Sequence, residues 1–124
     1  MALFRLSTLS ACLVLAACAS TGTPADGDAS TWAAGSDLQF TGRLSAVDTA
    51  PWAYDGNARL TVDSPAHGAV VVELPARWNL CKATGIDTAA KLAVGTPVRV
   101  NARVQEGRTV VVCASAAHGV TPAP

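Results

Sequence analysis

Few side chains in this 124-residue chain could do chemistry, and the cysteines are the first of them. A thiol can carry a lipid in a thioether, form a disulfide, or bind a metal ion as a thiolate. The chain has four cysteines, Cys12, Cys18, Cys81 and Cys113, and two histidines that could share a metal ion with them. The surroundings of each cysteine decide among these possibilities.

Cys18 ends an apolar segment at the N-terminus. Arg5 supplies a positive charge, and residues 6–17 are apolar apart from three hydroxyl residues. A membrane-spanning helix needs about 20 apolar residues, so residues 1–17 predict a signal peptide instead. Cys12 would leave with that peptide.

The tetrapeptide Leu15-Ala16-Ala17-Cys18 resembles the lipobox of bacterial lipoproteins. The resemblance implies cleavage before Cys18, a diacylglyceryl thioether on its thiol and an acyl chain such as palmitate on its amine. Two or more acyl chains hold a protein firmly on a membrane, whereas one does not. Position 19 is alanine and not the aspartate that often retains lipoproteins at the inner membrane. The resemblance therefore implies an outer-membrane protein that faces the periplasm.

The chain from Cys18 onward divides into two parts that differ in composition and sequence pattern. Residues 18–36 are mostly Ser, Thr, Gly, Ala, Pro and Asp without periodicity, which is typical of a flexible tether. Its one aromatic residue, Trp32, is expected at the surface, with docking on the domain or contact with the membrane as alternatives. Residues 37–124 are expected to form one domain.

Alternating apolar and polar residues predict strands in that domain. In residues 38–47, for example, Leu38, Phe40, Leu44 and Ala46 would share the inner face. A helix is predicted over residues 88–94, capped by Asp87 and stopped by Gly95 and Pro97. Residues 116–124 should fray. The expected strands are 38–47, 57–63, 69–74, 97–105 and 108–115.

This order, three strands, a helix and two strands, resembles the OB-fold over about residues 37–116. The resemblance implies an all-β domain, a small five-stranded Greek-key barrel with a short helix between strands three and four. A five-stranded barrel of the SH3-like type is the alternative.

In an OB-fold the third and fifth strands lie parallel and adjacent, so their C-terminal ends meet. Cys81 follows the third strand, and Cys113 lies late in the fifth. In the oxidising periplasm this pair predicts a disulfide. The alternative is a metal site that adds His67 and His118. Because the spacings typical of metal sites are missing, we expect no metal and no cofactor.

The loop of residues 48–59 is the predicted ligand site. It carries Trp52 and Tyr54, and the next strand presents Arg59 and Thr61 outward. Aromatic rings beside an arginine can stack on a sugar, a base or a peptide side chain. Alternatively, Trp52 plugs the mouth of the barrel.

Four outward-facing arginines could form a mild basic stripe that binds an anionic glycan, lipopolysaccharide or an acidic protein. Alternatively, they are ordinary solvated residues on the strand faces. They are Arg43, Arg59, Arg99 and Arg103.

The charge balance and the missing motifs disfavour two classes of function, nucleic-acid binding and catalysis. Nine basic residues balance nine acidic ones, which disfavours a nucleic-acid partner. Neither a Gly-x-Ser-x-Gly motif nor a glycine-rich phosphate loop occurs, and Asp48, Asp55 and Asp63 are expected to be solvated. We therefore expect a non-catalytic binding module of the cell envelope. The alternatives are a structural or interaction subunit of an envelope complex and a metal-binding lipoprotein.

Overall fold

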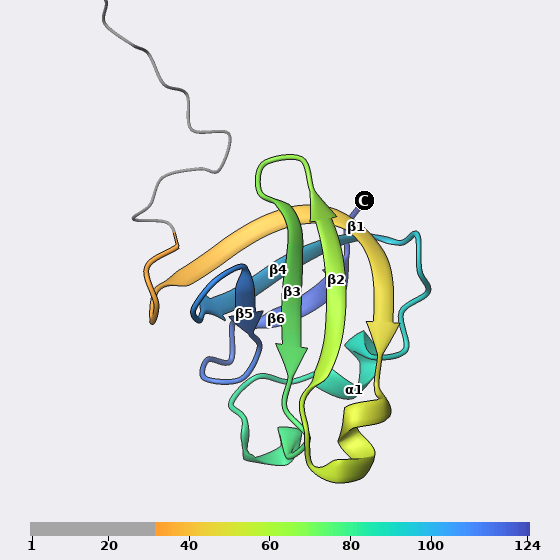
Figure 1. Cartoon of the computed structure of the whole chain (residues 1–124), viewed down its shortest axis with the longest axis vertical. Coiled ribbons are helices and arrows are strands. Elements are labelled where there is room, and N and C mark those ends of the chain that lie inside the picture. Colours follow the sequence, from red (N-terminus) through yellow and green to blue (C-terminus); the bar gives the residue numbers. More distant parts are fainter. Residues whose placement is uncertain (1–31) are drawn as a thin grey trace, which may run out of the picture.

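The computed structural model describes residues 32–124 (Figure 1). The predicted signal peptide and Cys18 lie outside the described residues. In chain order, the elements are β1 (Asp37–Asp48), η1 (Ala50–Tyr54), β2 (Ala58–Ser64), β3 (Gly68–Leu74), η2 (Trp78–Leu80), α1 (Ile86–Ala89), β4 (Pro97–Val104), β5 (Thr109–Val111) and β6 (Gly119–Pro122).

Five strands close a barrel. β1 pairs antiparallel with β2 through its C-terminal half and with β4 through its N-terminal half. β3 pairs antiparallel with β2 and parallel with β5, and β5 returns to β4. This closed circuit, with its parallel β3–β5 pair, confirms the predicted OB-fold-like all-β barrel.

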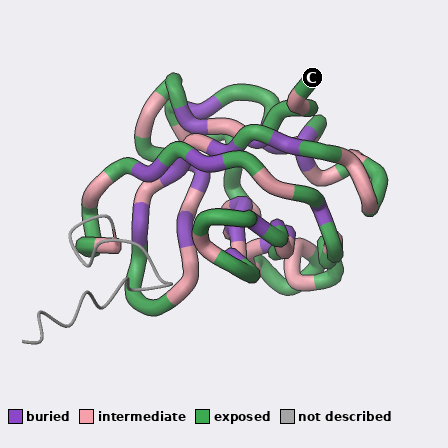
Figure 2. The backbone as a smooth tube through the Cα atoms, turned by 90° about the horizontal axis from the view of Figure 1, so that it is seen from above, coloured by how far each residue is buried: buried purple, intermediate pink, exposed green. Residues whose placement is uncertain are grey.

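The interior of the barrel is filled mainly by valine and leucine. Ala58, Leu60 and Val62 of β2 are all fully buried, as their alternation predicts. Figure 2 shows buried positions alternating with exposed and partly buried ones along the strands. Burying a valine or leucine side chain stabilises a fold by about 1.5–3 kcal/mol, so many small side chains compensate for the scarcity of aromatic ones.

A β-bulge changes the inward face of β1. The register with β2 shifts between Leu44 and Ala46. Leu44 is buried, but Ala46 is exposed and Val47 packs against the core in its place. The predicted inward position of Ala46 is therefore wrong, because an extra residue in a bulge reverses the alternation beyond it.

The single turn of α1 lies earlier than the predicted helix. Gly85, with φ 76°, precedes it, and Asp87 lies inside its first turn without capping it. Ile86 and Ala89 are buried, so packing against the barrel fixes where the turn begins. No helix within residues 32–124 is long and apolar enough to cross a membrane.

The C-terminal part of the chain differs most from expectation. β5 ends at Val111, whereas a strand was predicted to continue to residue 115. The tail that was predicted to fray forms β6, which pairs with β4 and packs against α1. Val120 is buried; this single apolar side chain and the ladder to β4 hold the tail in place.

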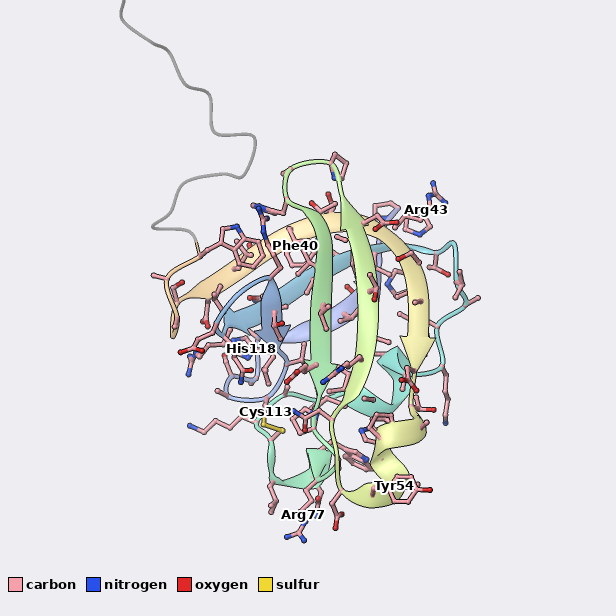
Figure 3. The ribbon with its side chains drawn as sticks, in the orientation of Figure 1. Phe40, Arg43, Tyr54, Arg77, Cys113 and His118 are labelled. Atoms are coloured by element: carbon pink, nitrogen blue, oxygen red, sulfur yellow. A yellow bond between two sulfur atoms is a disulfide. The ribbon has the colours of Figure 1, made fainter. Side chains whose placement is uncertain are left out.

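A disulfide joins Cys81 and Cys113 (Figure 3). Cys113 lies just after β5 and not within it. Its carbonyl oxygen accepts hydrogen bonds from the backbone N–H groups of Lys82 and Ala83, at 2.9 and 3.0 Å. The segment that leaves β3 is thus tied to the segment that leaves β5 by a covalent bond and two hydrogen bonds.

Candidate functional site

Trp52 acts as a plug in the predicted ligand loop. Its side chain packs against the core, and its indole N–H donates a hydrogen bond to the Leu74 carbonyl oxygen at 3.0 Å. Tyr54 is 88 % exposed and points away from the barrel (Figure 3). Arg59 is exposed and Thr61 half-buried on β2. Trp52 therefore serves the fold, while Arg59 and Thr61 lie on the outer face of β2 and Tyr54 is exposed on η1.

We expect Trp52→Ala to lower the free energy of unfolding by about 2 kcal/mol. A fully buried aromatic residue costs about 3–5 kcal/mol on truncation, and Trp52 is only partly buried. Urea titration of the variant measures the change. Tyr54→Ala is the matched control and should change the stability by less than about 0.5 kcal/mol. Equal losses in the two variants would contradict the plug.

Three of the four outward arginines have a carboxylate beside them. Arg103 donates from Nε to Asp37 Oδ1 at 3.2 Å. Arg43 lies opposite Asp63 in the β1–β2 ladder and donates to the Gly95 carbonyl oxygen at 2.6 Å. Cross-strand neighbours share one face of the sheet, so these charges offset one another.

Arg59 and Arg99 have different surroundings. Arg59 lies opposite a carboxylate on each side, one in β1 and one in β3. Arg99 lies opposite Thr41 in β1 and Thr121 in β6, both neutral. The four arginines therefore form no continuous basic stripe, and Arg99 is the one whose cross-strand neighbours carry no charge.

Arg99 lies where two hollows of the outer surface adjoin. The first, of about 370 Å³, lies between β1 and the β2–β3 turn. The second, of about 450 Å³, lies along β6 and the segment around α1. Gln39 and Arg99 line both, and we call the combined feature the Arg99 groove. Its other polar lining residues include Thr41, Ser64, His67, Asn101 and Thr121.

Aromatic rings form one end of the Arg99 groove. The ring of His67 lies edge-on to Trp32, at 5.4 Å between centroids, and to Phe40, at 5.8 Å. The Arg108 guanidinium lies 5.1 Å from the centre of the Trp32 ring and donates to the His67 carbonyl oxygen. Trp32 thus docks on the barrel, and the end of the predicted tether belongs to the packed domain.

His118 joins the C-terminal segment to the start of β1. It is 3 % exposed, and its Nε2 lies 3.0 Å from Asp37 Oδ1. The hydrogen bond from His118, more than that from Arg103, lowers the pKa of the Asp37 carboxyl below its ordinary value of 3.8. An ionised carboxylate can only accept, so Nε2 carries the proton. This contact holds the loop that precedes β6 (Figure 3).

The Asp37 contact makes part of the stability depend on pH. Because folding lowers the pKa of Asp37, its contribution is present above about pH 4 and is lost as the pH falls below that value. We expect the stability difference between the wild type and Asp37→Asn to shrink over that interval. Urea midpoints between pH 3 and 6 measure it. A constant difference across the series would contradict this role of Asp37.

The part of the chain that the structure describes offers few side chains that could bind a metal ion together. Cys81 and Cys113 are bonded to each other, so neither offers a thiolate. Within residues 32–124, no three His, Cys, Asp or Glu side chains gather in a way that could hold a metal ion.

Comparison with known proteins assigns this chain to no family. The chain matches no protein-family model and no curated protein sequence. A similar solved structure is the crystal structure of the ZRD-deleted mutant of TiaS in complex with agmatine. The identity is 13 % and the TM-score 0.47, over 69 % of this chain and 25 % of that one. The chain thus spans a quarter of the length of that protein.

Proposed function

We propose that this protein is a lipoprotein of the outer membrane, anchored through Cys18, whose barrel is a non-catalytic binding module in the periplasm. The sequence Leu15-Ala16-Ala17-Cys18 supports the anchor. The Cys81–Cys113 disulfide supports an oxidising compartment, since such bonds persist outside the reducing cytosol.

The observation that carries the binding role is the Arg99 groove. Small-molecule sites usually occupy about 300–1,000 Å³ and contain a few polar groups that fix the ligand. The two hollows of the groove have this size, and Gln39, Asn101 and Arg99 supply amide and guanidinium groups. These groups favour holding a ligand over reacting with it, because amides and guanidinium ions are poor nucleophiles and poor bases.

A structural or interaction subunit is the second candidate. Tyr54, Trp78 and Leu80 are exposed by 88 %, 43 % and 75 %. They belong to η1 and η2, which lie at the same end of the barrel (Figure 1). Exposed apolar side chains that gather in one region often mark a protein contact.

The anchor is tested by replacing Cys18. Without the thiol no thioether can form, so Cys18→Ser should lose the acyl mass and leave the outer-membrane fraction. Intact mass spectrometry and membrane fractionation measure both effects. Cys12→Ser is the control, because it keeps the lipobox and should retain lipid and location. An unchanged mass class and membrane partition of Cys18→Ser would overturn the anchor.

Photo-crosslinking in intact cells separates the two roles. A photoreactive amino acid at position 41 would report on the Arg99 groove, and one at position 54 on the apolar end. Adducts confined to position 41 support the binding module. Adducts to a protein confined to position 54 favour the interaction subunit and count against the binding role.

A further inference from the structure

We infer that the Arg99 groove binds a saccharide carrying one acidic group, a carboxylate or a phosphate, which pairs with the Arg99 guanidinium. This inference rests on the proposed binding role and adds the class of ligand. It is carried by the charges, the hydrogen-bonding groups and an unpaired histidine nitrogen of the groove.

The charge of the groove has one sign. Among residues 32–124, no aspartate or glutamate lines either of its hollows, whereas Arg99 lines both. A separate hollow, beside β3 and the β4–β5 turn, provides a contrast within the same molecule. Glu73 and Glu106 line it, and no arginine or lysine from the described part of the chain does. An anion is therefore attracted to the first site and repelled from the second.

Among residues 32–124, Arg99 is the one arginine or lysine that lines the groove, and Arg108 at the His67 end already contacts the Trp32 ring and the His67 carbonyl oxygen. The other outward arginines of β1 and β4, Arg43 and Arg103, already have carboxylate neighbours. A nucleic acid needs several phosphates to be neutralised at once for firm binding, and this chain has no net charge. A ligand with a single acidic group is the better match.

The remaining polar groups of the groove suit hydroxyl groups. Gln39 lies directly opposite Asn101, and Thr41 opposite Arg99, so two adjacent cross-strand pairs present amide, hydroxyl and guanidinium groups on the outer face of β1 and β4. Asn101 donates from its amide nitrogen to the Ala117 carbonyl oxygen at 2.9 Å, which fixes the orientation of its side chain. Amides both donate and accept hydrogen bonds, as sugar hydroxyls do.

A buried nitrogen at one end of the groove lacks a partner. His67 lines the first hollow, and its Nδ1 is buried without a hydrogen bond among the described residues. A buried polar atom left unpaired destabilises the folded state. A rotation of the ring would bring this nitrogen to a ligand oxygen in the first hollow.

The test compares Arg99→Gln with Arg59→Gln in the full lipidated protein in detergent micelles. Arg59 is a matched control because it is also exposed on the outer face but lies between two carboxylates. The probes are monomeric galacturonate, its methyl ester, and a glucosamine disaccharide with and without a single phosphate. Isothermal titration calorimetry measures each affinity, and thermal melting confirms that both variants are folded.

We expect the wild type to bind at least one acidic probe about tenfold more tightly than its neutral counterpart. Arg99→Gln should weaken that binding about tenfold or more, as the loss of a charge-assisted hydrogen bond does. Arg59→Gln should leave it within about twofold. Tighter binding of the uronate indicates a carboxylate ligand, and tighter binding of the phosphorylated disaccharide indicates a phosphate ligand.

Three results would overturn the inference: no binding of either acidic probe, equal binding of acidic and neutral probes, or unchanged binding in Arg99→Gln. None of these affects the fractionation of Cys18→Ser or crosslinking at position 41. Failure of the ligand class is therefore distinguishable from failure of the proposed function.

Discussion

Replacing Cys81 and Cys113 together by serine lowers the free energy of unfolding by about 3–4 kcal/mol. The disulfide closes a loop of 33 residues, counting both cysteines, because their sequence separation is 32. Such a crosslink restricts the unfolded chain by about this amount in the chain-entropy description. A domain of this size has only about 5–10 kcal/mol of stability in total. Urea titration under non-reducing conditions measures the loss.

The reduced wild type is the control for that double variant. Its thiols occupy the same positions without the crosslink, so its urea midpoint should match that of the serine variant. The variant should keep a barrel fold in dilute buffer but unfold at a much lower urea concentration. Equal midpoints for the oxidised wild type and the double variant would show that the crosslink contributes nothing to stability.

Replacing Gly42 by alanine lowers the free energy of unfolding by about 3 kcal/mol, near the upper end of the usual cost of overpacking. At Gly42, β1 passes from its pairing with β4 to its pairing with β2. A Cβ atom there would lie 2.5 Å from the Asp63 carbonyl oxygen and 2.7 Å from Val62 Cγ1. Because one of these atoms belongs to the backbone of a paired strand, the clash cannot be relieved by a rotamer change.

Gly119→Ala is the matched control for Gly42→Ala. Gly119 is also a strand glycine, at the start of β6, and a Cβ atom added to it meets no atom of residues 32–124 within 4 Å. Its change in stability should remain within about 0.5 kcal/mol. The difference between the two urea midpoints isolates the close approach of β1 and β2. Similar stabilities would contradict the clash.

The five strands of the barrel could be predicted because each is encoded by residues next to one another in sequence. Alternation in a strand places every second side chain on one face, so Leu60 and Val62 face inward wherever the strand lies. The Cys81–Cys113 pair followed from topology, because a parallel β3–β5 pair brings the two strand ends together. Alternation gave the wrong face for Ala46, because the bulge in β1 depends on its pairing with β2.

The candidate site needed the tertiary structure. Gln39 and Asn101 are 62 residues apart, and only the closure of the barrel through β1 and β4 places them opposite each other. The strand pairings also put Asp63 of β2 beside Arg43 while leaving Arg99 between Thr41 of β1 and Thr121 of β6. Part of the site could be predicted from the sequence, because alternation places Gln39 and Arg99 on the outer face. Which residues lie beside them on the neighbouring strands could not be predicted.

The sequence alone determined the all-β pattern of the domain. It also predicts the lipobox that ends at Cys18. Both are local, depending on alternation or on a run of adjacent residues. Only the tertiary structure decided that Trp52 closes the barrel, that Trp32 docks beside His67, and that the C-terminal tail becomes β6. Each of these segments carries too few apolar residues for a periodic signal, and each is held by burial against elements distant in sequence.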